Sequence, residues 1–156
     1  MQNLTNGDAM LDAVDKKLIE VLNKDGRINN NEIARKLSIS DGTVRNRIKK
    51  LADSGHLKVI GLLNPESRAD KQMILLGVKA CVTKDLMDKA KEISMLNGVQ
   101  SVCITTGRYD FIIEVWVDVE FGLVKFLSES LASVEGIASS ESFLVIKSYN
   151  KWISKV

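Results

Sequence analysis

A basic, polar stretch from Ser40 to Lys50 carries the side chains of this chain that are best suited to recognition chemistry. Arginine and lysine can donate to guanine or phosphate, asparagine can bond to adenine, and threonine can contact the thymine methyl group or a phosphate. On an α-helix, Val44, Ile48 and Leu51 fall on one apolar side of this stretch. The opposite side then carries the polar set Gly42, Arg45, Asn46 and Lys49, with Thr43 at its edge.

A second amphipathic segment and a short turn precede this stretch and position it. Ile33, Ala34 and Leu37 share one face of the preceding helix. The turn ends at Ser40, whose hydroxyl is a good N-cap for the next helix. Two short helices joined in this way, with a basic second helix, are typical of a helix-turn-helix, so the pattern predicts DNA binding. On the pattern alone, an ordinary solvated helix pair is the alternative.

The residues expected to contact DNA are polar and basic members of this helix pair. They are Lys36, Ser40, Gly42, Thr43, Arg45, Asn46, Arg47, Lys49 and Lys50. Gly42 would let the helix backbone approach a duplex closely. Arg47 lies toward the apolar side of its helix, so it either contacts phosphate or pairs with an acid of the first helix.

The distribution of charge favours a local contact with a polyanion. The 156 residues have a net charge of +2. Residues 1–60 carry 11 Lys/Arg against 8 Asp/Glu, whereas residues 61–156 carry 11 against 12. The excess is concentrated between residues 35 and 50, where Asp41 is the only acid. A basic patch on a nearly neutral protein fits focused phosphate contact.

Other function classes lack their usual sequence features. The sequence has no nucleophile–base–acid set, P-loop or dinucleotide fingerprint, so we expect no enzymatic activity and no cofactor. Cys81 and Cys103 are too far apart for a zinc site and are expected to be small apolar residues on strands. No apolar run reaches the length of a membrane span, and residues 1–10 do not form a signal peptide. We therefore expect a cytoplasmic protein with a flexible N-terminal arm.

Three helices form the expected first domain. A helix from about Asp12 to Lys24 precedes the helix-turn-helix and gives it a core. Its expected buried stripe consists of Leu11, Val14, Leu18, Val21 and Leu22. We expect a DNA-binding domain over residues 1–60, a linker over 61–66 and a second domain over 67–156. The extended stretch 56–63 is either a wing or part of the connector.

The second half of the chain alternates strand and helix patterns. Strands are expected over residues 72–82, 99–105, 109–118 and 137–147, and helices over 84–96 and 121–134. The resulting order, βαββαβ, is the ferredoxin-like arrangement. The predicted fold class is therefore α+β, with a three-helix helix-turn-helix domain followed by a ferredoxin-like domain.

Two of the expected strands, 72–82 and 109–118, are apolar on both faces. In the latter, Ile112 and Trp116 alternate with Phe111, Ile113 and Val115. The helices of a βαββαβ fold cover only one face of the sheet, and a second face open to water would show polar residues at alternate positions. We therefore expect the second face to pack against another copy of the chain. Cover by the C-terminal segment 149–156 is the alternative.

Several short motifs occur in a specific order from Leu11 to about Lys147. They are Leu11-Asp12 with Asp15, Asp25-Gly26-Arg27, Glu32-Ile33-Ala34 with Leu37, Ser40 with Val44, Arg47-Ile48-Lys49-Lys50-Leu51, Gly55 and Thr106-Gly107-Arg108-Tyr109-Asp110. Together they resemble the leucine-responsive/AsnC (Lrp/AsnC, feast/famine) family of transcription regulators. One departure is Ser38, because the family often has glycine in this turn and Ser38 would have to take a conformation that suits glycine better.

The resemblance implies an N-terminal DNA-binding domain and a C-terminal domain that senses small molecules. It also implies dimers, which often assemble into tetramers or octamers. In this family an amino-acid effector binds between the C-terminal domains of adjacent dimers. The family motif Gly-x-Tyr-Asp maps onto residues 107–110.

The residue types of that turn are compatible with such a ligand. Gly107 can take a positive φ and expose N–H groups to a carboxylate, Arg108 can bind a carboxylate, and Asp110 can bind an ammonium group. A plain hairpin turn with solvated side chains is the alternative. The expected effector-binding residues are Gly107, Arg108, Tyr109 and Asp110, joined by Ser139, Ser140 and Glu141 if the last strand lies beside the turn.

These features together predict a sequence-specific, DNA-binding transcription regulator that responds to a small molecule, by expectation an amino acid. An architectural DNA-packaging protein without an effector is one alternative, and it would show little sequence preference. The other is a regulatory subunit of an amino-acid metabolic enzyme, because βαββαβ domains also occur in such enzymes.

Overall fold

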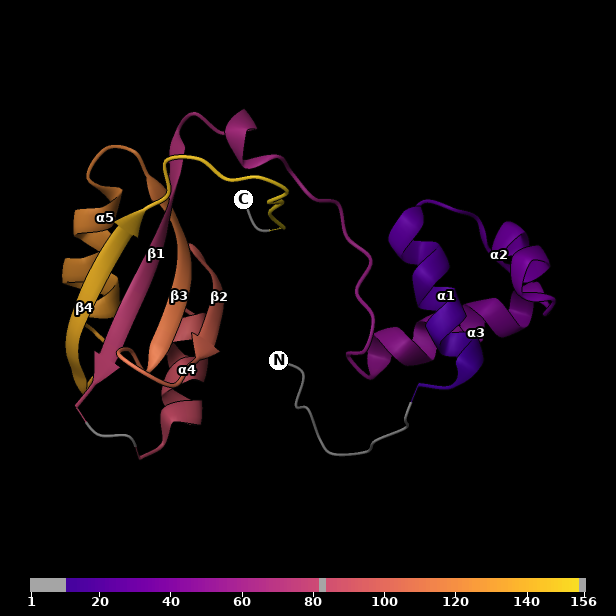
Figure 1. The fold of residues 1–156 in the computed structure, drawn as a ribbon, viewed down its shortest axis with the longest axis horizontal. Coiled ribbons are helices and arrows are strands. Elements are labelled where there is room, and N and C mark those ends of the chain that lie inside the picture. Colours follow the sequence, from indigo (N-terminus) through magenta and orange to yellow (C-terminus); the bar gives the residue numbers. More distant parts are fainter. Residues whose placement is uncertain (1–10, 82–83, 155–156) are drawn as a thin grey trace. The chain divides into compact units, whose positions relative to one another are not determined.

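The computed structural model describes residues 11–81 and 84–154, and the chain divides into two compact units, Met1–Gly61 and Leu62–Val156 (Figure 1). The expected N-terminal arm and the last residue of the expected strand 72–82 lie outside the described residues. Among the described helices, none is both long and apolar enough to cross a membrane.

Three helices make up the first unit: α1 (Ala13–Lys24), α2 (Asn30–Leu37) and α3 (Asp41–Asp53). A side chain caps the start of each one, because Asp12, Asn29 and Ser40 accept hydrogen bonds from backbone N–H groups three residues further along the chain. The helices enclose a small apolar core, which confirms the predicted buried stripes. Its buried members are Leu18, Leu22, Ile33, Ala34, Val44 and Leu51.

The turn between α2 and α3 contains a strained residue. Ser38 lies in the left-handed region, with φ 55° and ψ 43°, and its N–H donates to the carbonyl of Arg35. A side chain in this region crowds the backbone, and glycine does not. The turn therefore holds Ser38 in a conformation that suits glycine better than serine.

The second unit is a four-stranded antiparallel sheet with the strand order β2-β3-β1-β4. This is the arrangement that the βαββαβ order produces, so the predicted fold class is confirmed. Its elements are η1 (Pro65–Ser67), β1 (Lys71–Ala80), α4 (Leu86–Ser94), β2 (Val99–Ile104), β3 (Phe111–Asp118), α5 (Gly122–Lys125), the π-helix η2 (Phe126–Leu131) and β4 (Ile137–Leu144).

The second helical segment and the last strand differ from the expectation, and the stretch 56–63 follows one of its two expected alternatives. The helix expected over 121–134 is a single α-turn followed by a π-helix, which apolar spacing alone does not distinguish from an α-helix. Strand β4 ends at Leu144 rather than at residue 147, opposite Ile74 of β1. Residues 56–62 form no strand, although Leu63 makes one antiparallel bridge with Ile153. The stretch 56–63 is therefore a connector rather than a wing.

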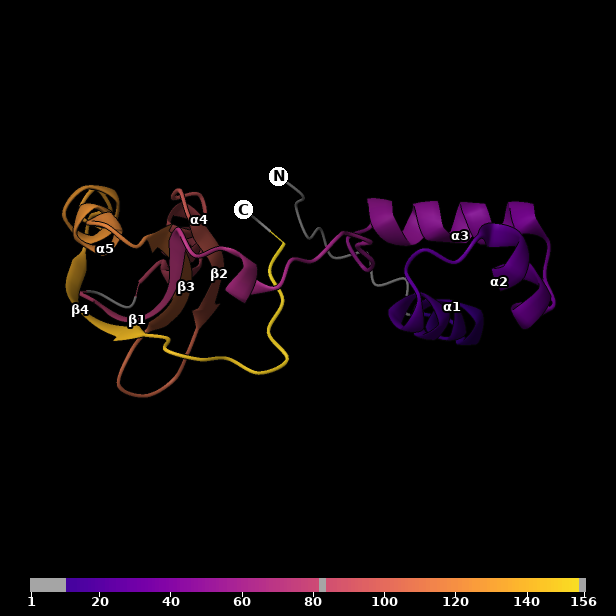
Figure 2. The ribbon, with the colours of Figure 1, turned by 90° about the horizontal axis from the view of Figure 1, so that it is seen from above.

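Both helical segments of the second unit lie on one face of its sheet (Figure 2). The core between helices and sheet contains alternate residues of the two central strands, together with Ile93, Phe126 and Leu131. On the opposite face, Ile153 packs against Met73 and Trp116.

The C-terminal segment thus covers one end of the second face. At this end the alternative expectation, cover by residues 149–156, holds. Lys151 also reaches this face, where its Nζ lies 2.5 Å from Oε2 of Glu114. Beyond this segment, Leu75 and Ile112 are half-buried and the side chain of Phe143 is exposed. A substantial part of the second face is therefore uncovered in the single chain.

We expect the substitution Ser38→Gly to stabilise the first unit by about 1 kcal/mol, because it removes the Cβ from a left-handed residue. Native-state hydrogen exchange at the buried amides of α2 and α3 should slow about fivefold. Ser54, with φ −83°, is the control, since glycine brings no relief there. Faster exchange in Ser38→Gly would show that the turn is not strained.

Candidate functional site

The outer face of α3 is polar and exposed, as its sequence predicts. Val44 and Leu51 are buried, and Ile48 packs partly against the same core. The apolar side of the helix therefore faces inward and leaves the opposite side free. The exposed residues on α3 include Gly42, Thr43, Arg45, Asn46, Lys49 and Lys50.

Two of the expected DNA-contacting cations are held by acids one helical turn away. Arg45 Nη2 lies 2.6 Å from Oδ2 of Asp41, and Lys36 Nζ lies 3.0 Å from Oε1 of Glu32. The Arg45 side chain is nevertheless 70% exposed. Within the described part of the chain, Lys49 and Lys50 have no ion-pair partner. The face thus offers two unpaired lysines and an accessible, pre-oriented arginine.

The start of α3 is fixed by two hydroxyl groups. Ser40 Oγ accepts from the backbone N–H of Thr43 at 3.1 Å and lies 2.8 Å from Thr43 Oγ1. Both side chains are exposed. Ser40 and Thr43 are therefore part of the helix cap as well as of the exposed face.

Arg47 joins α3 to the beginning of α1. Its Nη1 lies 2.6 Å from Oδ2 of Asp12 and 2.7 Å from Oδ1 of Asp15. The backbone N–H of Asp15 and the guanidinium of Arg47 lower the pKa of Asp12, and the two carboxylates raise the pKa of Arg47. Of the two interpretations that the sequence leaves open for Arg47, the geometry supports pairing with acids at the first helix.

The turn between β2 and β3 is closed by backbone contacts. Thr105 N–H donates to the carbonyl of Asp110 at 2.9 Å, and Thr105 Oγ1 donates to the carbonyl of Tyr109 at 2.9 Å. Gly107 has φ +113°, and a Cβ there would meet nothing within 4 Å. Its conformation, rather than any crowding, therefore favours glycine at this position. Figure 2 shows the turn projecting away from the helices.

Tyr109, Arg108 and Glu141 form a cluster on the uncovered face of the sheet. The hydroxyl of Tyr109 donates to Oε2 of Glu141, and Arg108 Nη2 lies 3.3 Å from the same oxygen. The Arg108 guanidinium also lies 5.4 Å from the centre of the Tyr109 ring. Glu141 is opposite Gly77 in the pairing of β1 with β4. The last strand therefore lies beside the turn, as the expected site requires.

Asp110, in contrast, is directed into the structure. It is 7% exposed, and its Oδ2 accepts from the backbone N–H of Ala80 at 2.8 Å while Oδ1 lies 3.3 Å from Lys79 Nζ. The N–H of Ala80, assisted by Lys79, holds the pKa of Asp110 below its usual value despite burial. This carboxylate ties the end of β1 to the start of β3.

The two serines of β4 lie on different faces of the sheet. Ser139 pairs with Lys79, and Ser140 pairs with Val78, whose side chain belongs to the core beneath the helices. Because successive side chains of a strand point to opposite faces, Ser139 shares a face with Glu141 and Ser140 does not. The structure thus brings Arg108, Tyr109 and Glu141 together but places Ser140 on the other side.

Two residues near this cluster were not found from the sequence. A Cβ on Gly77 would lie 2.7 Å from the ring of Tyr109, so Gly77 provides the space in which that ring lies. A glycine inside a strand pattern is the signal that could have identified it. Lys79, the partner of Asp110, gives a weaker signal as the only charged residue in the interior of an apolar strand.

Family models match both halves of the chain. Residues 11–52 match the AsnC-type helix-turn-helix domain, and residues 73–151 match the Lrp/AsnC ligand binding domain. An uncharacterised HTH-type transcriptional regulator of Pyrococcus furiosus is 34% identical over 144 residues, which cover 92% of this chain and 96% of the relative. The HTH-type transcriptional regulator Ptr1 of Methanocaldococcus jannaschii is 33% identical over 144 residues, or 90% and 95% of the two chains.

Solved structures show the same fold. A transcriptional regulator of Neisseria meningitidis, determined in complex with L-methionine, superposes with a TM-score of 0.72 at 26% identity and covers 94% of this chain and 96% of its own. AsnC of E. coli has a TM-score of 0.70 at 21% identity, with 89% and 94% covered, and supports the fold alone.

We expect the stability of the second unit to depend on the charge of Asp110. Because the folded-state pKa lies below the ordinary value of 3.8, the stabilisation is fully present above that pH and is lost as the pH falls through the lower, folded-state pKa. Asp110→Asn should therefore unfold at lower urea concentration than the wild type at pH 7, with a much smaller difference at pH 2.5. Both tryptophans, Trp116 and Trp152, lie in this unit and report its unfolding.

The control is Asp118→Asn, at a side chain that is 66% exposed. It should change the midpoint much less at pH 7. An Asp110→Asn effect of equal size at both pH values would indicate a packing role instead of a charge role.

Proposed function

The chain belongs to the Lrp/AsnC family of HTH-type transcriptional regulators, and on that premise we propose how it binds DNA and its effector. It combines a DNA-binding domain with a ligand-binding domain and acts in transcription regulation, not as an enzyme. The observation that carries the proposal is the exposed polar face of α3, which is held in place by the buried apolar side of the same helix.

In the proposed complex, α3 lies in the major groove. Arg45 and Asn46 contact base edges, and Thr43 contributes at the start of the helix. Lys36, Lys49 and Lys50 contact phosphates, which adds affinity without sequence preference. Arg47 does not contact DNA but fixes the orientation of α3 through Asp12 and Asp15. Gly42 and Ser40 bring the start of the helix close to the backbone of the duplex.

The proposed effector is an amino acid bound at the cluster of Arg108, Tyr109 and Glu141. The complex of the Neisseria relative with L-methionine supports this ligand class. Glu141 Oε2 is occupied by Tyr109 and Arg108, whereas Oε1 has no partner in the described structure and is available to an ammonium group. Arg108, with a side chain that is 79% exposed, would bind the carboxylate. Asp110 acts as a positioning residue, because both its oxygens are already engaged.

The proposed assembly is a dimer that forms larger oligomers in the cytoplasm. The uncovered face of the sheet supports pairing of two copies, because Leu75, Ile112 and Phe143 are not shielded by the chain itself. A dimer presents two α3 helices to DNA half-sites about 34 Å apart. An effector bound between dimers favours one assembly over another in proportion to its difference in affinity for the two.

The first test distinguishes base contacts from phosphate contacts on α3. After selection of the preferred operator from a random DNA library, Arg45→Ala should cost about 1–3 kcal/mol and relax preference at one position. Lys50→Met should weaken binding to all sequences and reduce the salt dependence by about one ion. Fluorescence anisotropy at several salt concentrations measures both effects, with Lys91→Met on α4 as the control. An unchanged selection profile for Arg45→Ala would exclude base reading by Arg45.

The second test concerns the ammonium contact. Glu141→Gln should weaken binding of the amino acid that the wild type prefers by about tenfold or more, because it removes a charged acceptor. Calorimetry across the twenty amino acids, combined with mass measurement of the assembly, identifies that ligand. Ser140→Ala, on the same strand but on the other face, should bind normally. Full binding by Glu141→Gln would remove Glu141 from the site.

A further inference from the structure

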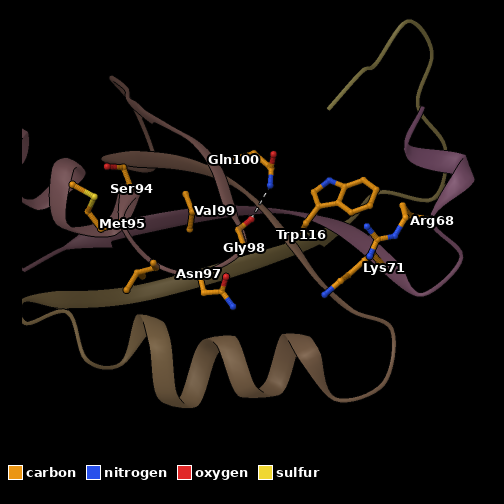
Figure 3. Close-up of a pocket in the computed structure, with 10 residues that line it drawn as sticks. Arg68, Lys71, Ser94, Met95, Asn97, Gly98, Val99, Gln100 and Trp116 are labelled. Atoms are coloured by element: carbon orange, nitrogen blue, oxygen red, sulfur yellow. Dashed lines mark hydrogen bonds between the residues drawn. The ribbon is translucent and has the colours of Figure 1, made fainter. Parts of the chain in front are cut away.

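A cavity of about 430 Å³ lies at the end of the β2–β3 pair that is remote from the Gly107 turn (Figure 3). Its walls come from the segment before β1 and the first residue of that strand, from the loop between α4 and β2 with the start of β2, and from strand β3. Trp116 marks this end of β3, whereas Phe111 adjoins the turn at the other end. Five residues of strand separate the two, or about 17 Å. The cavity is therefore distinct from the proposed amino-acid site.

Two cations with unused donors line one side of the cavity. Arg68 donates through Nε and Nη2 to Asp70, at 2.8 and 2.7 Å, and its Nη1 has no hydrogen-bond partner among the described residues. Lys71 Nζ donates one hydrogen bond to Asp118 at 2.6 Å, and its other two N–H groups can donate to a ligand. The pKa of Asp70 is lowered to about 2 by Arg68, so this carboxylate stays charged and fixes the guanidinium. Both cations are thus held in place and can still donate to a ligand.

A buried donor without a partner lies on the same wall. Trp116 is 7% exposed, and within the described residues its indole Nε1 has no hydrogen-bond partner. In Figure 3 the nitrogen lies on the edge of the ring that faces Gln100. One 3.3 Å bond, from Nε2 of Gln100 to the carbonyl of Gly98, holds that half-buried side chain. Gln100 and Trp116 both line the cavity, so an acceptor that enters between them would satisfy the indole N–H.

The lining of the cavity favours a ligand without an ammonium group. Among the described residues, no acidic side chain lines the cavity directly, and the nearby carboxylates of Asp70 and Asp118 are already paired with Arg68 and Lys71. The ammonium group of a free amino acid would have to displace one of these cations to gain a carboxylate partner. Asn97 adds a further amide donor, and Met95 and Val99 provide apolar surface. The lining therefore matches a ligand with acceptor oxygens and a small apolar body.

We propose that this cavity binds a small carboxylate without an ammonium group, of the 2-oxo acid class. The carboxylate lies between Arg68 and Lys71, and the oxo oxygen accepts from the indole N–H of Trp116. The side chain of the ligand lies against Met95 and Val99. The second unit would then bind two chemically different ligands at opposite ends of one strand pair.

The test uses the full chain with Trp152→Phe, which leaves Trp116 as the only tryptophan. Pyruvate, 4-methyl-2-oxopentanoate and 2-oxoglutarate are titrated while Trp116 emission is followed, each beside its matching amino acid, alanine, leucine or glutamate. In the Glu141→Gln chain, whose amino-acid site is weakened, at least one oxo acid should change the emission with saturation and bind about tenfold or more tightly than its amino acid. Glu141→Gln should leave this affinity unchanged, which separates the result from the amino-acid site.

Two variants test the contacts. Lys71→Met should weaken oxo acid binding about tenfold, whereas Lys91→Met, on the exposed side of α4, should not. Trp116→Phe keeps an aromatic ring but removes the donor, and calorimetry should show weaker binding. Saturation by none of the three oxo acids below about 10 mM, equal binding of the amino acids, or an unchanged affinity in Lys71→Met would each overturn the proposal.

Discussion

The two helical segments of the second unit cover the same face of its sheet, and the other functional features of this unit follow from that asymmetry. The covered face carries the apolar core of the unit. The second face carries everything else: the C-terminal segment at one end, the Tyr109 cluster at the other, and apolar residues between them. An apolar sheet face of this kind is stable in water only when something covers it. In the proposed assembly, pairing of copies and binding of the amino acid would therefore use one surface.

Gly77 shows how closely the backbone and the site depend on each other. The ring of Tyr109 lies against β1 only because position 77 has no Cβ, and the hydroxyl can then reach Glu141 on the next strand. Asp110, one residue further on, turns the other way and ties β3 to the N–H of Ala80. Consecutive residues of one turn thus serve different purposes: Tyr109 and Arg108 meet Glu141 at the proposed ligand site, and Asp110 holds the turn to the sheet.

The helices and strands could be predicted from the sequence because burial of one face requires apolar residues at a regular spacing. Val44, Leu51 and the alternating residues of β3 show this period directly, so the fold class could be predicted. The roles of Asp110 and Arg47 could not be settled in the same way. Which backbone N–H the Asp110 carboxylate accepts from depends on the register of β1 against two other strands. The two partners of Arg47 lie 35 and 32 residues away in the sequence. Local sequence spacing therefore predicts neither contact. Gly77 is different, because a glycine within a strand does point to a close approach of another group.

The two arginines of α3 differ in how firmly they are held, and this difference assigns their roles. Arg45 pairs with one acid on its own helix, and its side chain is 70% exposed. An exposed pair of this kind contributes only about 0–1 kcal/mol, so a guanine edge or a phosphate can replace Asp41 at little cost. Arg47 is 29% exposed and contacts two carboxylates that are themselves linked in the cap of α1. Releasing it would leave the carboxylates of Asp12 and Asp15 without a cation and would remove the ion pairs between α3 and the start of α1. In the proposed complex, Arg45 is therefore the arginine that would exchange its partner for DNA, and Arg47 is the one that would keep the exposed face of α3 oriented.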